Sequence, residues 1–484
     1  MKVHDLKDSY SPLPSLVMAV MFSVFVLALC GSVSIAHSFL LGGPPTSVDP
    51  GQPLFLSPYI AGGHFQQAQN LSRVVSLQGS SILSYSGYIT VNAYFNSNLF
   101  FWFIPAQHAD PRTAPLILWL EGGPGTSGLF ALFVQNGPFV VDKDVKLSPR
   151  KTADWSLQYS MLFIDNPVGT GFSFTDSDKG YTTTEDDVAR DLYSFLLQFY
   201  TMFPKFQKND LYVTGESYGG KYISAISYKI HTENPHAKIS INLKGLFIGA
   251  GFIDPISMIP AYADYLFNVG LFDENERQYF HGQIQKITEL VKAKDFKKAM
   301  DIFYAAMLGK GFFYHATGYV AHENILQVRN PANMTYFASY VDHPEVRRAI
   351  HVGDLSYTAF SKQVGRHLYT DILDTVRPWF VTLLNSGKYK ILLFNGQLDI
   401  IVCAPATEAM LDSMTEWKDQ AAYKQATKHI WRVSPTDKDV AGYVRAVGNF
   451  TQVIVREAGH IIAFNQPDRA YDMLQRYIED RPFY

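Results

Sequence analysis

A chain of 484 residues with 47% apolar residues can bury a large core, either as two domains or as one α/β domain with an insertion. Its formal net charge of −3 and its charged fraction of 18% argue against a polybasic surface, so we expect no nucleic-acid partner and no electrostatic membrane binding. No fixed-period repeat or low-complexity block interrupts the chain.

The N-terminus has the pattern of a secretory signal. Lys2 and Lys7 precede an apolar run over residues 16–29, and Ser34-Ile-Ala36 supplies a cleavage site. We therefore predict a signal peptide over residues 1–36 and no stable membrane association after its cleavage. The alternative is an uncleaved anchor, because the apolar stretch is just long enough to span a bilayer.

Sequons and cysteines bear on the same question. The three N-x-S/T sequons at Asn70, Asn333 and Asn449 predict a glycoprotein of the secretory route, secreted or lysosomal. Cys30 lies in the predicted signal, which leaves Cys403 alone in the mature chain. The mature chain can then form no internal disulfide, so its stability must come from its core.

The predicted elements alternate between strands and helices. Residues 37–80 are rich in Gly, Pro, Ser and Gln and are interpreted as an N-terminal arm. A hairpin is expected over residues 86–104, and the apolar runs at 115–120 and 161–165 are typical of buried parallel strands. The remaining predictions are a helix at 182–203, strands at 211–213, 243–248, 390–394 and 452–456, and a closing helix at 469–478.

This alternation predicts an α/β fold with a mostly parallel, doubly wound sheet. Residues 255–365 break the rhythm with a long, mostly helical pattern that includes Lys/Glu-rich stretches. We interpret them as an inserted helical cap over the carboxyl edge of the sheet. The core is then divided into a first part at 81–254 and a second part at 366–484.

The motif Gly215-Glu-Ser217-Tyr-Gly219 lies between a predicted strand and a helical pattern. This is the setting of a nucleophile elbow, a tight turn that holds a serine hydroxyl above the sheet. Glycine is needed at both ends because a side chain there would crowd the turn. Ser217 is therefore the candidate nucleophile.

A serine hydroxyl needs a base to take its proton and a carboxylate to orient that base. In this architecture the partners follow in the order Ser, Asp, His, each after a late strand. Asp399 follows the strand at 390–394, and His460 follows the strand at 452–456. An aspartate in such a place is more often a turn or cap, and a lone histidine more often packs, but together and in this order they predict a triad.

Backbone N–H groups must also meet the oxyanion. One is expected from Tyr218, directly after the nucleophile, and the other from Gly123 in the turn Glu121-Gly-Gly-Pro-Gly125, which follows the strand at 115–120. This turn has no Lys or Ser/Thr at P-loop spacing, so phosphate binding is disfavoured.

Across about residues 84 to 480 the chain resembles the serine carboxypeptidases, and its C-terminal stretch resembles their vitellogenic-carboxypeptidase-like branch. The resemblance rests on long motifs in a fixed order. These are Trp119-Leu-Glu-Gly-Gly-Pro-Gly125, Asp165-Asn-Pro-Val-Gly-Thr-Gly-Phe-Ser-Phe174, Gly215-Glu-Ser-Tyr-Gly-Gly-Lys-Tyr222, Asn395-Gly-Gln-Leu-Asp399 and Ala458-Gly-His460, with Ala441-Gly-Tyr-Val-Arg445 to Asp468-Arg-Ala-Tyr-Asp472 marking the branch.

The resemblance implies an α/β-hydrolase with a helical cap that removes single C-terminal residues from peptides at acidic pH. It implies peptide or protein C-termini as partners, no metal and no organic cofactor, and it leaves open whether the chain forms a homodimer. It assigns Ser217, Asp399 and His460 to the triad, and Gly123 and Tyr218 to the oxyanion hole. The disulfides typical of the family are absent.

The resemblance also implies a site for the substrate's terminal carboxylate. Glu216 matches its protonated acid, and Glu121 stands where the family commonly has Asn. If both face the substrate, three carboxyl groups share one small site, cannot all ionise, and titrate as a coupled unit. Binding would then weaken as pH rises. The alternative is that Glu121 points away and pairs with a basic group.

Two other functions remain open at this point. An acyltransferase or esterase would use the same triad, and a binding or stabilising protein would retain it as a vestige. A blocked dipeptide and its ester distinguish them: release of the terminal residue supports the peptidase, ester transfer alone supports the second, and no turnover supports the third.

Overall fold

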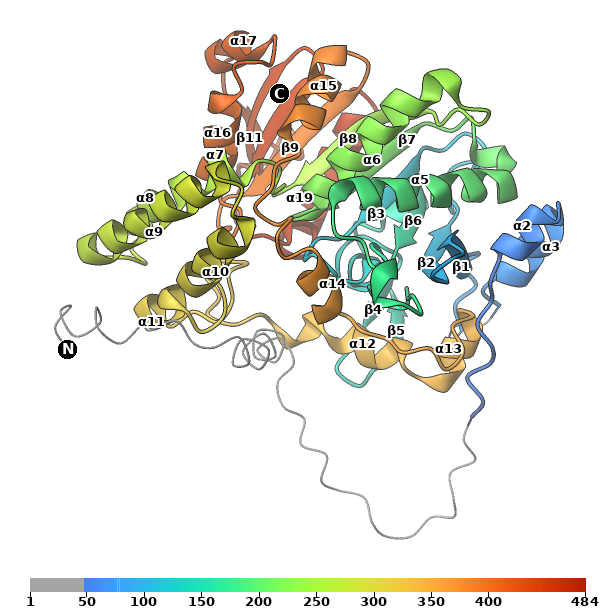
Figure 1. The fold of residues 1–484 in the computed structure, drawn as a ribbon. Coiled ribbons are helices and arrows are strands. Elements are labelled where there is room, and N and C mark those ends of the chain that lie inside the picture. Colours follow the sequence, from blue (N-terminus) through green and yellow to red (C-terminus); the bar gives the residue numbers. More distant parts are fainter. Residues whose placement is uncertain (1–47, 76, 78) are drawn as a thin grey trace.

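The computed structural model describes residues 48–75, 77 and 79–484, and its frame is a ten-stranded sheet (Figure 1). The predicted signal peptide at 1–36 lies outside the described residues. The strand order is β1-β2-β6-β3-β7-β8-β9-β12-β11-β10. The strands are β1 Tyr85–Asn92, β2 Ser97–Ile104, β3 Leu116–Leu120, β6 Ser160–Ile164, β7 Leu211–Glu216, β8 Leu243–Gly249, β9 Lys390–Gly396, β10 His429–Trp431, β11 Gly442–Val447 and β12 Phe450–Val455.

The six central strands, from β6 to β12, run parallel to one another. Antiparallel pairs border them, with β1 and β2 at one edge and β11 and β10 at the other. Every side chain of β3 is buried, as expected for a parallel strand that is covered on both faces. The predicted hairpin and all the predicted central strands are therefore present.

Two hydrophobic cores lie on opposite faces of the sheet. In β3, Leu118 belongs to the core under α5 (Glu185–Met202) and α6 (Gly219–Glu233), whereas Trp119 belongs to the core under α19 (Pro467–Ile478). Successive side chains of a strand point to opposite faces, so one strand supplies both cores. The parallel alignment brings the carboxyl ends of β3, β7, β9 and β12 to one edge.

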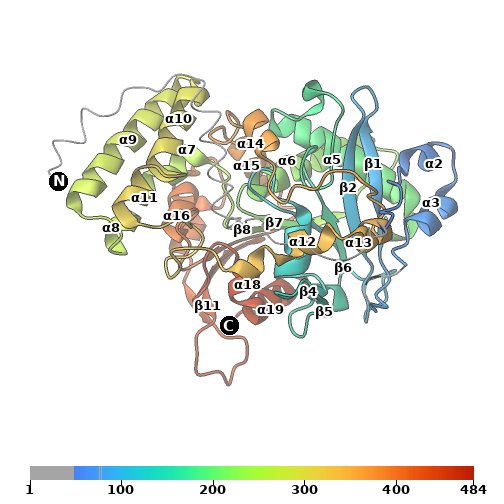
Figure 2. The ribbon, with the colours of Figure 1, turned by 90° about the horizontal axis from the view of Figure 1, so that it is seen from below.

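A long helical insertion separates β8 from β9 and flanks this edge. The helices α8 to α11 form a group at one side, and α12 and α13 run along another (Figures 1 and 2). This agrees with the helical pattern predicted at 255–365, whose bounds as a domain stay a prediction. The helices are α7 Pro255–Met258, α8 Tyr262–Asn268, α9 Glu274–Lys292, α10 Phe296–Met307, α11 Phe312–Thr317, α12 Tyr336–Val341, α13 Pro344–Ala349 and α14 Lys362–His367.

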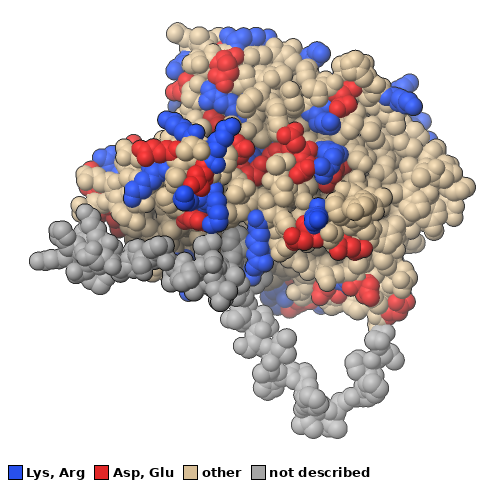
Figure 3. Space-filling model, viewed as in Figure 1, with Lys and Arg blue, Asp and Glu red and all other residues tan. Residues whose placement is uncertain are grey.

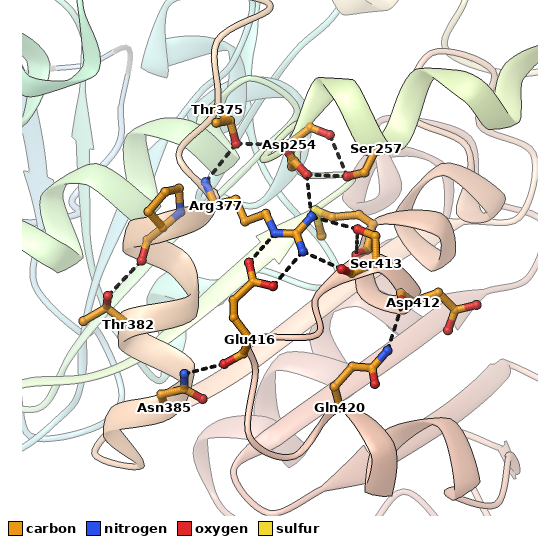
Figure 4. Close-up of polar contacts among 12 residues, drawn as sticks. Asp254, Ser257, Thr375, Arg377, Thr382, Asn385, Asp412, Ser413, Glu416 and Gln420 are labelled. Atoms are coloured by element: carbon orange, nitrogen blue, oxygen red, sulfur yellow. Dashed lines mark hydrogen bonds and ion pairs between the residues drawn. The ribbon is translucent and has the colours of Figure 1, made fainter. Parts of the chain in front are cut away.

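An ionic network ties the two ends of the insertion together (Figure 4). Arg377, at the start of α15 (Arg377–Ser386), donates to Asp254 at 3.1 Å and to Glu416 at 2.6 Å. Thr375 donates to the other oxygen of Asp254 at 2.7 Å. Asp254 lies five residues after the end of β8, so this contact links the segment where the chain leaves the sheet to the segment through which it returns.

The described part of the predicted N-terminal arm is folded. It carries α2 (Ser57–Ala61) and α3 (Phe65–Ser72), which pack on β1 and α5. Leu56 is fully buried, and its N–H donates to Tyr88 of β1 at 2.9 Å. Apolar residues spaced along this Gly/Pro-rich segment thus cover the edge of the sheet.

Several elements were not predicted from the sequence. They include the edge strands β10 and β11, the small β4–β5 hairpin (Phe139–Val141 and Leu147–Pro149), and helices α2, α3, α15, α16 (Ala404–Ser413), α17 (Gln420–Gln425) and α18 (Ile462–Asn465). In the part of the chain that the structure describes, no helix has the length and apolar character to cross a bilayer. On the face seen in Figure 3, positive and negative side chains are interspersed.

Candidate active site

The turn between β7 and α6 has the geometry of a nucleophile elbow. Ser217 adopts a left-handed conformation with φ 63°, which is strained for a residue with a side chain. A Cβ atom at Gly215 would lie 2.0 Å from the carbonyl oxygen of Leu120, and a Cβ atom at Gly219 would lie 2.5 Å from it. The two glycines therefore allow the turn to press against β3, as the motif predicts.

Asp399 and His460 are brought together at the ends of β9 and β12. The His460 Nδ1 lies 2.7 Å from Asp399 Oδ2, and both residues are buried. The other Asp399 oxygen accepts from the Val402 N–H at 3.0 Å. With Nδ1 facing the carboxylate, the second ring nitrogen of His460 is left to act as a base.

Opposing effects set the pKa of His460. Burial disfavours the imidazolium and lowers the pKa. The negative charge and hydrogen bond of Asp399, with smaller contributions from Glu323 and Glu121, outweigh burial, so the net pKa is raised. His460 thus takes up a proton readily when these carboxylates are ionised.

A segment of the insertion, residues 322–325, holds the turns that carry Asp399 and His460. The N–H of His460 donates to the Glu323 carbonyl at 2.5 Å, and the N–H of Ile325 donates to Leu398 at 2.9 Å. The His322 carbonyl accepts from the N–H of Ile400 at 3.3 Å. The insertion therefore contributes directly to the position of both predicted triad members.

The glycine-rich turn after β3 lies against the elbow. A side chain on Gly122 would meet Ser217 Cβ at 2.7 Å and the Tyr218 nitrogen at 2.9 Å. Within the described residues, neither the Gly123 N–H nor the Tyr218 N–H donates to a protein acceptor. Both amides are thus available beside Ser217, as an oxyanion hole requires.

Glu121 and Glu216 form a buried pair beside this turn. Their carboxyl groups are hydrogen-bonded to each other. Gln135 Nε2 donates to Glu216 at 2.8 Å and to Glu121 at 3.2 Å, and Trp119 Nε1 donates to Glu121 at 2.8 Å. No lysine or arginine among the described residues forms an ion pair with either acid, and the basic group whose charge acts on the pKa of Glu121 is His460.

The pair has raised pKa values because it is buried without a cation. Burial raises the pKa of Glu121 to about 7, against hydrogen bonds that lower it. Burial also raises the pKa of Glu216 well above its usual range, and the charge of Glu121 raises it further. Two carboxyl groups this close cannot both ionise cheaply, so the pair holds a proton well above the ordinary range of glutamate.

Ser217, His460 and Glu121 open into one cavity of about 240 Å³. Apolar side chains form most of its wall, and a smaller set of polar side chains completes it. The apolar set includes Phe252, Tyr262, Met300, Phe303, Leu308, Ile372, Ile401 and Val402, and the polar set includes Thr126, His322, Glu323, Asn330 and Thr335. Such a cavity fits a side chain beside a small number of oriented polar groups.

An ionic cluster lies behind the elbow. Lys221 of α6 contacts the Asp371 carboxylate, and the Tyr218 hydroxyl donates to the same carboxylate at 2.5 Å. Glu185 lies in the same cluster, and burial followed by the charge of Asp371 raises its pKa well above the usual range. The cluster anchors the residue that supplies one of the two available amides.

The three sequons and the cysteine marked by the sequence do not line the cavity. Asn70, Asn333 and Asn449 are all exposed, so each is accessible to a glycosylating enzyme. Cys403 is buried at the start of α16, and burial raises the pKa of its thiol, which keeps it unreactive. Among the described residues, no group of three His, Cys, Asp or Glu is placed to hold a metal ion.

Three residues of this region were missed by sequence reasoning. Gln135 ends a short π-helix at 131–135, Glu323 lies in the insertion, and Asp371 lies in the segment before α15. None of them belongs to a short motif. For Gln135, the sequence shows only an amide within an apolar run. That pattern does not indicate which side chains the amide contacts.

Comparison with known proteins relates this chain to one family over most of its length. A family model described as serine carboxypeptidase matches residues 76–480. The mouse protein named "Probable serine carboxypeptidase CPVL" is 48% identical over 438 residues, which cover 90% of each chain. The venom serine carboxypeptidase of Apis mellifera is 41% identical, over 90% of this chain and 92% of its own.

Two further similarities agree with this result. The vitellogenic carboxypeptidase of Aedes aegypti is 39% identical, over 88% of this chain and 90% of its own. The crystal structure of a prohormone-processing carboxypeptidase from Saccharomyces cerevisiae matches with a TM-score of 0.74 at 22% identity, over 85% of this chain and 96% of that chain. The predicted fold class is therefore confirmed.

Proposed function

The chain belongs to the serine carboxypeptidase family, as its resemblance predicted, and we propose that it hydrolyses the C-terminal peptide bond of peptides and proteins through an acyl-enzyme on Ser217 at acidic pH. Family membership makes it a hydrolase of the serine carboxypeptidase type. The observation that supports the detailed proposal is the cavity lined by Ser217, His460 and Glu121, with Glu216 paired to Glu121 behind its wall.

In the first half-reaction, Ser217 Oγ attacks the scissile carbonyl carbon and His460 takes the hydroxyl proton. The Gly123 and Tyr218 N–H groups stabilise the oxyanion. His460 then gives the proton to the leaving amine as the C–N bond breaks, which releases the C-terminal residue and leaves an ester on Ser217. Water, deprotonated by His460, hydrolyses that ester. Asp399 holds Nδ1 and stabilises the imidazolium.

The Glu121–Glu216 pair accounts for the restriction to chain ends. A carboxylate on the substrate cannot approach an ionised acid pair without a cation, but it can accept a hydrogen bond from a protonated acid. The raised pKa values keep a proton on the pair under acidic conditions. A peptide interior has no carboxylate to accept that hydrogen bond.

The protonation of the carboxyl pair and of His460 should limit kcat/KM on either side of a pH optimum. The carboxyl pair must hold its proton, which limits activity on the alkaline side, and His460 must be neutral to act as a base, which limits it on the acidic side. Protonation of Glu121 also removes a negative charge that raises the pKa of His460. The two groups therefore favour each other's active form, and kcat/KM should follow a bell-shaped curve.

A blocked dipeptide and its methyl ester test the reaction class. We expect release of the free C-terminal residue from the acid-terminated peptide below neutral pH. Transfer from an ester to an added alcohol, without peptide cleavage, would favour the acyltransferase instead. Failure to turn over either compound at any pH would contradict the catalytic role of the site.

We further propose that the chain enters the secretory pathway and is glycosylated at Asn70, Asn333 and Asn449, for secretion or for the lysosome. Their exposure supports this. N-terminal sequencing of the secreted protein should begin near His37, and enzymatic deglycosylation should increase its gel mobility. A chain that keeps Met1 and sediments with membranes would favour the anchor. Whether it forms a homodimer stays a prediction that sedimentation would test.

A further inference from the structure

Glu323 brings an acidic side chain to the wall of the catalytic cavity. It is half-buried, and its Oε2 accepts the His322 N–H at 2.8 Å. Unlike most carboxylates of the protein, it has no lysine or arginine partner among the described residues. Among the described residues, the cavity wall contains no lysine or arginine, and its basic side chains are the imidazoles of His322 and His460.

The chemistry of the reaction indicates which part of the substrate would meet Glu323. His460 must reach the leaving amine, so the released residue lies on the His460 side of Ser217. The main chain of Glu323 binds the His460 N–H at 2.5 Å, which fixes it on that side.

We propose that Glu323 binds a basic side chain, lysine or arginine, of the residue that is released, so that peptides ending in a basic residue are preferred substrates. This inference rests on the carboxypeptidase activity proposed above. The Glu121–Glu216 pair would hold the terminal carboxylate while Glu323 pairs with the side-chain cation. The two ends of one amino acid are thereby bound by acids with different tasks.

The cavity wall at Glu323 favours a cationic side chain on the released residue. An ammonium or guanidinium brings its own charge to a half-buried carboxylate, and charge-assisted hydrogen bonds of this kind are about twice as strong as neutral ones. The aliphatic stem of lysine or arginine can pack along apolar side chains such as Met334 and Ile461, which also line the cavity. An acidic side chain would meet like charge and should be rejected.

A purely positional role for Glu323 makes a different prediction. Glu323→Gln keeps an oxygen that can accept from the His322 N–H and keeps the main-chain bond to His460, but it removes the charge. If the charge of Glu323 only changes the pKa of His460, kcat/KM should change by the same factor for all substrates. If it binds the released side chain, kcat/KM should fall for basic substrates alone.

The experiment uses blocked dipeptides that share one first residue and end in Arg, Lys, Leu or Met, assayed at about pH 5.5, where an ordinary glutamate is ionised. For Glu323→Gln we expect the ratio of kcat/KM for Arg over Leu to fall at least about tenfold, since one lost charge pair in a binding site has an effect of this order. Glu289→Gln, an exposed carboxylate on α9, removes the same charge and should leave the ratio unchanged.

Product inhibition of the native enzyme provides a second measurement that needs no variant. Free arginine should inhibit at a concentration several-fold lower than free leucine. Equal inhibition, or an unchanged Arg/Leu ratio in Glu323→Gln, would overturn this inference and leave the carboxypeptidase activity standing. A uniform loss on all four peptides would also overturn it. No release from any peptide by the native enzyme would overturn the proposed function and this inference together.

Discussion

Two groups of buried carboxyl groups flank Ser217, and they differ in whether a cation is present. On the cavity side, Glu121 and Glu216 are hydrogen-bonded to each other and to Gln135. Behind the elbow, Asp371 contacts the Lys221 ammonium, which is itself fully buried. The same elbow therefore separates a carboxyl pair that must hold a proton from a carboxylate that is neutralised by a side chain.

The difference shows how burial can give carboxyl groups opposite tasks. A buried charge is costly unless a partner compensates it. Lys221 compensates Asp371, which makes that cluster a fixed support for Tyr218. The acid pair can be compensated only by protons, which come from solvent, so its state follows the pH. We therefore assign support of the site to the Lys221 cluster and pH-dependent binding to the acid pair.

The largest effect is expected when the nucleophile that lies between the two groups of buried carboxyls is removed. Ser217→Ala should lower kcat by about 10⁵- to 10⁶-fold, because the covalent route is lost, while the fold and the acid pair remain. The variant should still bind a product amino acid at acidic pH. His460→Ala should cause a similar loss, and the double variant should lose little more. Near-native turnover by Ser217→Ala would show that the nucleophile lies elsewhere.

Removing the Lys221 cation should destabilise the fold. Lys221→Met leaves Asp371 and Glu185 buried without compensation, so we expect the free energy of unfolding to fall by about 3–5 kcal/mol. Glu216→Gln is the matched change on the other side of Ser217, and at pH 7 it should cost little because it removes a group that is costly to ionise. Urea denaturation of both variants gives the comparison. Equal destabilisation would contradict the distinction between the two groups.

The acid pair should also make stability depend on pH. A carboxyl whose pKa is raised on folding stabilises the fold fully below its unfolded pKa and loses that contribution as pH rises through its folded pKa. For Glu121, raised to about 7, the window lies between about pH 4.5 and 7, and the loss amounts to at most about 3 kcal/mol. Glu121→Gln should flatten this part of the curve. Parallel curves for the two proteins would count against the raised pKa.

The sequence allowed the sheet, the turn at Ser217 and the Asp399–His460 contact to be predicted because all three depend on local signals. The apolar runs of β3 and β7 require burial on both faces, and the glycines around Ser217 require a tight turn. Asp399 and His460 follow strands that the parallel sheet brings to one edge. Order along the chain was therefore sufficient to predict their meeting.

The rest of the site depends on contacts between segments that are far apart in the sequence. Gln135 reaches Glu216 from a π-helix, and Glu323 reaches His460 from the insertion. Asp371 meets Lys221 across 150 residues. No periodicity or spacing fixes such contacts, because they depend on how irregular segments pack against the sheet. The orientation of Glu121 was open for the same reason, since its neighbours come from other elements.

The central claim is that the Glu121–Glu216 pair binds the substrate carboxylate through a shared proton, and KM against pH tests it most directly. The measurement compares the native protein with Glu121→Asn on one blocked dipeptide. We expect the native KM to rise steeply as pH increases through the titration of the pair, and the variant to keep a low KM closer to neutral pH, because an asparagine amide donates at any pH. Superimposable profiles would contradict the claim and leave the assignment of Ser217 untouched.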